Sequence, residues 1–260
     1  MSAASGIPSD LAPKRPHRGG RIALIALVVV LVLVAVLLVV AEFVVRGIVD
    51  RTIADRVEQS LPDGSTGQVH ADAHGIVLPQ LLGGTLDDVD VSSKRLTVQG
   101  VPFAVTATVH DVPVSGTGST GAIDGRVRLA SSAVQDLGIL DQVSGDITLR
   151  KGGIAWDGTT TILGYDVDYR VLADLAAASN GKGVTVTPQT VRVTDSDLGL
   201  DFGGSVPGVS GTPVNLCTAT YLPAELRLRS LDITAAAASA RLSGAHLPLS
   251  EKGLLTTGTC

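Results

Sequence analysis

The sequence predicts an α+β protein in which an N-terminal transmembrane helix precedes a strongly curved antiparallel β-sheet that wraps an amphipathic helix. Residues 22–41 form an uninterrupted apolar run. Residues 42–61 then repeat apolar side chains at helical spacing, and from Thr66 the period changes to two, which is typical of strands. Few later segments have a helical period, so the sheet has to bury its apolar face by curling or by pairing with a second sheet.

The apolar run contains only Leu, Ile, Val and Ala. A helix of this length covers about 30 Å, the hydrocarbon thickness of a bilayer, and it lacks the polar face of a soluble core helix. Lys14, Arg15, Arg18 and Arg21 precede the run, so the positive-inside rule places the segment before it in the cytoplasm. A cleaved signal peptide is the alternative, although the run exceeds the usual apolar length of a signal.

These features divide the chain into a basic cytoplasmic tail (1–21), a transmembrane anchor (22–41) and an extracytoplasmic domain (42–260). The last region holds 24 acidic and 16 basic side chains. An acidic domain argues against nucleic acid as a partner, because nucleic acid requires a basic surface. We therefore expect a protein of the cell membrane and cell envelope.

Cys217 and Cys260 are the only cysteines, and both lie in the predicted extracytoplasmic domain. An oxidising compartment favours one disulfide between them. The loop of about 44 residues that it closes would stabilise the fold by roughly 4 kcal/mol in the chain-entropy model. Two free thiols are the alternative.

Residues 42–61 continue as an amphipathic helix that ends at Leu61-Pro62-Asp63-Gly64. Its apolar stripe recurs every four residues, with charged side chains on the other face. We expect the following sheet to cover this stripe. The stripe consists of Val45, Val49, Ile53, Val57 and Leu61.

Strand patterns fill most of the remaining chain, and the strictest alternation runs over residues 103–110. Residues 76–84 are expected as a turn or short helix, residues 133–140 as a short helix and residues 174–178 as a helical turn. Lys151-Gly152-Gly153 predicts a hairpin. Further strands are expected around residues 69–73, 86–98 with an interruption near 92–94, 123–129, 147–149, 154–156, 163–171, 184–193 as a pair around Pro188, 226–233 and 238–247.

The inward side chains of such a sheet are mainly Val, Ala, Leu and Thr. Small side chains across a wide curved sheet fill the interior less completely, so an apolar channel for an apolar ligand is one interpretation of the interior. A dry, fully packed sandwich is the alternative. The candidate lining residues are Val49, Ile53, Val57, Leu78, Leu81, Leu82, Phe103, Val105, Val109, Leu129, Leu137, Leu163, Tyr165, Tyr169, Leu228 and Ile233.

No catalytic pattern stands out, because the GxSxG, phosphate-loop and reactive-cysteine motifs are absent from the sequence. His70, Asp72 and His74 alternate along one strand face and could ligate a metal, although a solvated face is the simpler interpretation. The same holds for calcium at the acidic residues of 87–90. No Asp pair has the arrangement of a glycosidase. We expect no enzyme, no cofactor and no metal.

Three short segments resemble the LmeA-like phospholipid-binding family of actinobacterial envelope proteins. They are Leu78-Pro79-Gln80-Leu81-Leu82-Gly83-Gly84, Val89-Asp90-Val91, and Leu222-Pro223 followed by Leu226-Arg227-Leu228. The resemblance implies an elongated fold similar to the tubular lipid-binding (TULIP) superfamily, with a groove for acyl chains. It also implies a phospholipid or phosphatidylinositol-type glycolipid as partner, a role in maintaining envelope lipids or lipoglycans such as lipomannan, and no catalytic residues.

Two functions follow from these observations. The first is a membrane-anchored protein that holds or shuttles acyl chains in an apolar groove, with residues 42–61 and 76–82 forming a lip that meets the bilayer. The alternative is a non-catalytic scaffold of the cell envelope with a dry core.

Overall fold

The computed structural model describes residues 18–59, 64–98, 100–135, 145–162, 165–196, 211–250, 253 and 256–260. The chain divides into two units, Met1–Val44 and Val45–Cys260. Helix α1 (Arg18–Gln59) passes through both. Its described part from Val28 onward has a window of mean hydropathy 3.3 and is long and apolar enough to cross a membrane. The apolar helix predicted from the sequence is therefore present.

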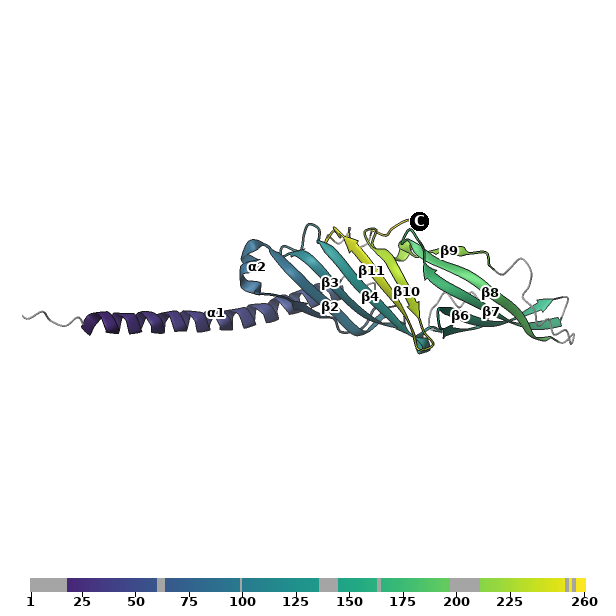
Figure 1. Ribbon diagram of the computed structural model, residues 1–260, viewed down its shortest axis with the longest axis horizontal. Coiled ribbons are helices and arrows are strands. Elements are labelled where there is room, and N and C mark those ends of the chain that lie inside the picture. The colour runs from purple at the N-terminus through teal and green to yellow at the C-terminus, as the bar shows by residue number, and fades with distance from the viewer. Residues whose placement is uncertain are drawn as a thin grey trace, which may run out of the picture. The chain divides into compact units, whose positions relative to one another are not determined.

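The second unit contains two open antiparallel sheets (Figure 1). The first has the strand order β1 (His70–Ala73), β2 (Thr85–Val98), β3 (Val101–Pro113), β4 (Ala122–Ala130), β11 (Ala237–Ala245) and β10 (Arg227–Ile233). The second has the order β5 (Asp146–Arg150), β6 (Gly153–Ile162), β7 (Tyr165–Ala177), β8 (Gly183–Ser196) and β9 (Val214–Cys217). The predicted α+β class is confirmed, and the strands are divided between two sheets.

Most local predictions agree with these elements. The segment 76–84 forms helix α2 (Val77–Gly83), and Gly84 ends it with a φ of 84°. The predicted hairpin joins β5 to β6, since Arg150 pairs with Gly153. Strand β2 continues through residues 92–94, where a register shift between Ser93 and Leu96 explains the broken alternation.

The helical turn predicted at residues 174–178 is wrong. Residues 174–177 continue strand β7, because Leu175 pairs with Val186 and Ala177 with Val184 on β8. These long-range pairings override the local helix preference of an Ala-rich segment. Strand β8 is likewise continuous through Pro188, which lies beside a register shift where the ladder is already irregular. Of the helix predicted at residues 133–140, the structure shows a 3₁₀ turn (Ser131–Ala133), and residues 136–140 lie outside the described residues.

Polar side chains of α1 bind the outer edge of β1. Asp50 Oδ1 accepts the backbone N–H of Ala73 at 2.9 Å, and Glu58 Oε1 accepts that of Val69 at 2.9 Å. Arg46 donates to the carbonyl of Gly75 and lies 3.9 Å from a carboxylate oxygen of Asp72. An edge strand otherwise presents a row of unsatisfied backbone groups, so these contacts protect the start of the sheet.

The apolar stripe of α1 packs beside this edge. Ala73, Val77, Leu86 and Val89 form a buried cluster, and side chains of α1 pack against it together with others from α2 and the sheet. The helical stripe therefore meets the sheet, as its spacing predicts. The partly buried members are Val45, Val49, Ile53, Leu81, Val91 and Val112.

The predicted disulfide is confirmed. Cys217, at the end of β9, bonds Cys260 with a Cα–Cα distance of 5.9 Å. Nearby, Gly258 N–H donates to the carbonyls of Ala219 and Leu222, each at 3.0 Å. The crosslink thus joins residues 256–260 to the edge strand of the second sheet.

The buried cluster gives a stability prediction. Leu86 is 2% exposed, so Leu86→Ala should leave a cavity and lower the free energy of unfolding by about 3 kcal/mol. Leu82→Ala is the matched control, because Leu82 is 87% exposed and its truncation removes no core contact. Urea unfolding of both variants followed by circular dichroism measures the difference. Equal stabilities would show that Leu86 is not a core residue.

Candidate functional site

The first sheet has one apolar face whose side chains come from five strands. Antiparallel register places directly opposed residues on the same face of a sheet. Reading the pairings across β3, β4, β11 and β10 therefore gives three apolar rows. The rows are Phe103–Leu129–Ala238–Ile233, Val105–Val127–Ala240–Leu231 and Ala107–Gly125–Leu242–Leu228, and Val91 of β2 extends the last.

The middle of this face is only partly covered. Phe103, Val105, Val127 and Leu129 lie on central strands, where an apolar side chain is normally buried, yet all four keep intermediate exposure. Ile233 on the edge strand β10 is buried, at 4% exposure. Ala and Gly occupy much of the centre of the rows, so larger side chains border a region of small ones.

The second sheet also carries an apolar face. Trp156 of β6 lies opposite Val171 of β7, which lies opposite Val191 of β8. The ring of Trp156 meets Tyr169 edge to face, with centroids 5.4 Å apart, an arrangement that aromatic pairs favour. Tyr169 was a candidate from alternation. Trp156 was not among the predicted lining residues, although strand alternation after the predicted hairpin places its side chain on the same face of the second sheet as that of Tyr169.

The structure brings six of the sixteen predicted lining residues onto the apolar face of the first sheet. They are Phe103, Val105, Val109, Leu129, Leu228 and Ile233. Tyr169 lies on the second sheet, while Val49, Ile53 and Leu81 pack on the buried cluster. Lipid contact by any of these residues stays a prediction.

The other predicted lining residues lie elsewhere. Val57 and Leu78 are half-buried on α1 and α2, and Leu82 is 87% exposed. Leu137 and Leu163 fall outside the described residues, and only the backbone of Tyr165 is described. The predicted lining set lacked the other members of the rows, which are Ala107, Gly125, Val127, Leu231, Ala238, Ala240 and Leu242.

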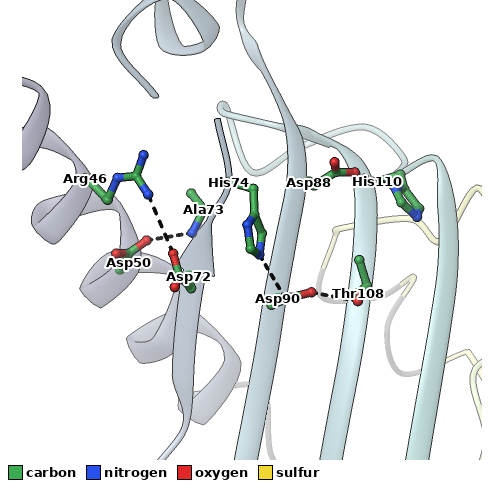
Figure 2. A network of polar contacts seen from close by, with 9 residues as sticks. All are labelled: Arg46, Asp50, Asp72, Ala73, His74, Asp88, Asp90, Thr108 and His110. Atoms are coloured by element: carbon green, nitrogen blue, oxygen red, sulfur yellow. Dashed lines mark hydrogen bonds and ion pairs between the residues drawn. The ribbon is translucent and has the colours of Figure 1, made fainter. Parts of the chain in front are cut away.

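The opposite face of the first sheet is polar. His74, which follows β1, donates from Nε2 to Asp90 Oδ2 at 2.9 Å, and Thr108 Oγ1 donates to Asp90 Oδ1 at 2.6 Å (Figure 2). His110 and Asp88 form a second pair beside them. These contacts join residues after β1 to β2 and β3.

The contact between His74 and Asp90 shifts the pKa of both side chains. The hydrogen bond with Asp90 raises the pKa of His74, and the charges of Asp90, Asp72 and Asp88 add to this effect while desolvation opposes it. The hydrogen bond from Thr108, followed by that from His74, lowers the pKa of Asp90. Within the described residues, no group of three or more His, Cys, Asp or Glu side chains is placed to hold a metal ion.

A family model for LmeA-like phospholipid-binding proteins matches residues 40–242. The chain belongs to this family. The matched range begins within α1 and extends to Leu242 of β11, so it includes every residue of the three apolar rows. Comparison with curated proteins and with solved structures found no match. The LmeA-like family is a lipid-binding family, which agrees with the resemblance seen in the sequence, and its matched range ends before Cys260.

The His74–Asp90 pair predicts a pH dependence. A raised His pKa contributes stability that is complete below the unfolded value of 6.5 and is lost as pH rises through the folded pKa. A lowered Asp pKa contributes stability that is complete above the unfolded value of 3.8 and is lost as pH falls through the folded pKa. The pair therefore stabilises the fold most between these two unfolded values.

Asp90→Asn should bring the pKa of His74 back toward its ordinary value, as measured by NMR titration of the imidazole protons. Thr108→Val is the control, because it removes the hydroxyl that binds Asp90 and keeps the carboxylate beside His74. A His74 pKa unchanged by Asp90→Asn would contradict the assigned cause.

Proposed function

We propose that this LmeA-like protein is a membrane-anchored, extracytoplasmic phospholipid-binding protein that holds acyl chains against the apolar face of the first sheet. The observation that carries the proposal is the partial exposure of Phe103, Val105, Val127 and Leu129 at the centre of that sheet. The proposal involves binding alone, with no chemical step.

The energetics favour such a guest. Removing an acyl chain from water gains about 0.8 kcal/mol per buried CH₂, so a 16-carbon chain supplies on the order of 12 kcal/mol. Half-exposed side chains on the protein gain further when the chain covers them. Flexible acyl chains also adapt to a surface that mixes small and large side chains. Binding of this kind requires apolar area and shape but few specific polar contacts.

Two exposed aliphatic side chains supply a contact with the bilayer. Ile76 directly precedes helix α2 and is 65% exposed, and Leu82 lies in the last turn of α2 and is 87% exposed. Val77 of the same helix belongs to the buried cluster against which Val45 and Val49 pack. In this proposal α2 lies in the interfacial region and passes lipid between the bilayer and the sheet, and its own Leu78 and Leu81 contact the lipid on the way.

The apolar part of α1 is proposed as the tether. The basic residues before it stay in the cytoplasm, and the unit from Val45 lies outside. The finer proposal is that the protein shuttles phosphatidylinositol-type glycolipid and so supports lipoglycans such as lipomannan. Cleavage as a signal peptide is the alternative, and N-terminal sequencing of the mature chain from the membrane fraction distinguishes the two.

The test compares lipid occupancy of full-length protein purified in a mild detergent. Ala240→Trp should fill the space between Val127 and Leu231 without adding a charge, and should reduce co-purified phospholipid at least tenfold. Ala104→Trp is the matched control, because Ala104 lies on β3 opposite Arg128 and therefore on the polar face. Native mass spectrometry counts bound lipid.

Circular dichroism melting shows whether each variant remains folded. Equal occupancy in folded Ala240→Trp and wild-type protein would place lipid elsewhere. Absence of lipid from wild-type protein, even after incubation with phosphatidylglycerol vesicles, would favour the scaffold with a dry core.

A further inference from the structure

The polar face of the first sheet contains a hollow of about 520 Å³. Its walls come from β2, β3, β4, β11 and β10, and three of its lining residues are arginines: Arg126, Arg229 and Arg241. We name this feature the arginine hollow. Its volume lies in the range of pockets that bind small organic molecules, which is larger than a single inorganic anion needs.

Two of these arginines face each other. Arg126 of β4 lies directly opposite Arg241 of β11 in the antiparallel register, where Cβ atoms are about 5 Å apart and like charges destabilise the sheet. Both side chains are exposed. The ion pairs among the described residues include neither of them, nor Arg229. The arrangement therefore maintains a repulsion that an anion would relieve.

A strand irregularity adds the third arginine. The register of β10 with β11 shifts between Leu228 and Ser230, and Arg229 is the extra residue. Its Nε donates to Ser243 Oγ on β11, which holds the guanidinium over the polar face. Sequence alternation alone does not show this placement, because the extra residue changes which side chains of β10 lie on which face of the sheet.

Hydroxyls and carboxylates lie beside the arginines in the same hollow, since Thr106 lies opposite Arg126 and Asp124 lies opposite Ser243. Ser92, Thr106 and Thr108 supply hydroxyls, and Asp90 and Asp124 supply carboxylates. Asp90 already accepts hydrogen bonds from His74 and Thr108. Asp124 forms none of the ion pairs of the described residues, so its carboxylate oxygens are available to accept hydrogen bonds from the hydroxyl groups of a ligand.

We propose that the arginine hollow binds the phosphate of a phosphorylated sugar or polyol. Arginine forks match phosphate oxygens in charge and geometry. The hydroxyls of the ligand then lie against Asp124 and Thr106. The site is on the opposite face of the sheet from the proposed acyl-chain surface, so it does not depend on that proposal. A soluble sugar phosphate and the headgroup of a membrane lipid present the same chemistry.

Isothermal titration of the full-length chain in neutral detergent with glucose 1-phosphate tests the site. We expect saturable binding that weakens about tenfold or more in Arg126→Gln and in Arg241→Gln, as the loss of a charged hydrogen bond predicts. Arg192→Gln is the matched control, because Arg192 is an exposed arginine on β8 of the second sheet and should leave the affinity unchanged.

Thermal melting separates lost binding from lost folding. Each substitution in the Arg126–Arg241 pair removes a like-charge repulsion, so the variants should melt at or above the wild-type temperature. The proposal would be overturned if the wild-type protein shows no saturable binding, or if binding persists in the double variant that combines Arg126→Gln with Arg241→Gln. Inorganic phosphate should bind more weakly than glucose 1-phosphate, and equal affinities would overturn the role given to Asp124 and Thr106.

Competition identifies the source of the phosphate. Displacement of glucose 1-phosphate by micelles containing phosphatidylglycerol, but not by phosphatidylcholine micelles, would support the site and assign it to a lipid headgroup. Failure of both micelles to compete, with the arginine dependence intact, would support the site and assign it to a soluble sugar phosphate.

Discussion

Asp50 and Glu58 of α1 accept the backbone N–H groups of Ala73 and Val69, and the first sheet depends on this contact. Strand β1 has only four residues and pairs with β2 on one side, so its other edge would expose unsatisfied donors. The helix satisfies them with carboxylates and covers the adjoining side chains with its apolar stripe. A helix rather than another strand therefore ends the sheet, and the same helix continues into the apolar segment of the chain.

One sheet consequently separates two kinds of chemistry. Five long strands alternate apolar and polar side chains, so every row that faces one way has a polar row behind it. The apolar rows offer a wide apolar contact area built largely from small side chains. The polar rows carry arginines, hydroxyls and carboxylates. Because a one-residue slip would exchange the two faces, the register of the strand pairings determines both surfaces at once. The bulge at Arg229 is the exception, since it places an additional cation on the polar side.

Periodicity predicted much of this fold, because it reports local burial. The helical stripe at Val45, Val49 and Ile53 and the alternation from Phe103 to Val109 both matched the structure. Partners far apart in sequence were not predictable: Arg126 and Arg241 are neighbours only through the pairing of β4 with β11. Residues 174–177 were misjudged for the same reason, since β8 holds them extended. The division into two sheets also results from long-range pairing, and it separated Tyr165 and Tyr169 of β7 from the lining candidates on the first sheet.

The bond between Cys217 and Cys260 has a practical consequence for producing this protein. Besides the disulfide, a bridge from Thr257 to Pro223 and backbone hydrogen bonds hold residues 256–260. Thiols remain reduced in the cytosol of most cells, so material overexpressed there would lack the crosslink and would leave the short edge strand β9 less firmly attached. Export during synthesis, or refolding with a glutathione couple, is the route that yields the mature covalent form.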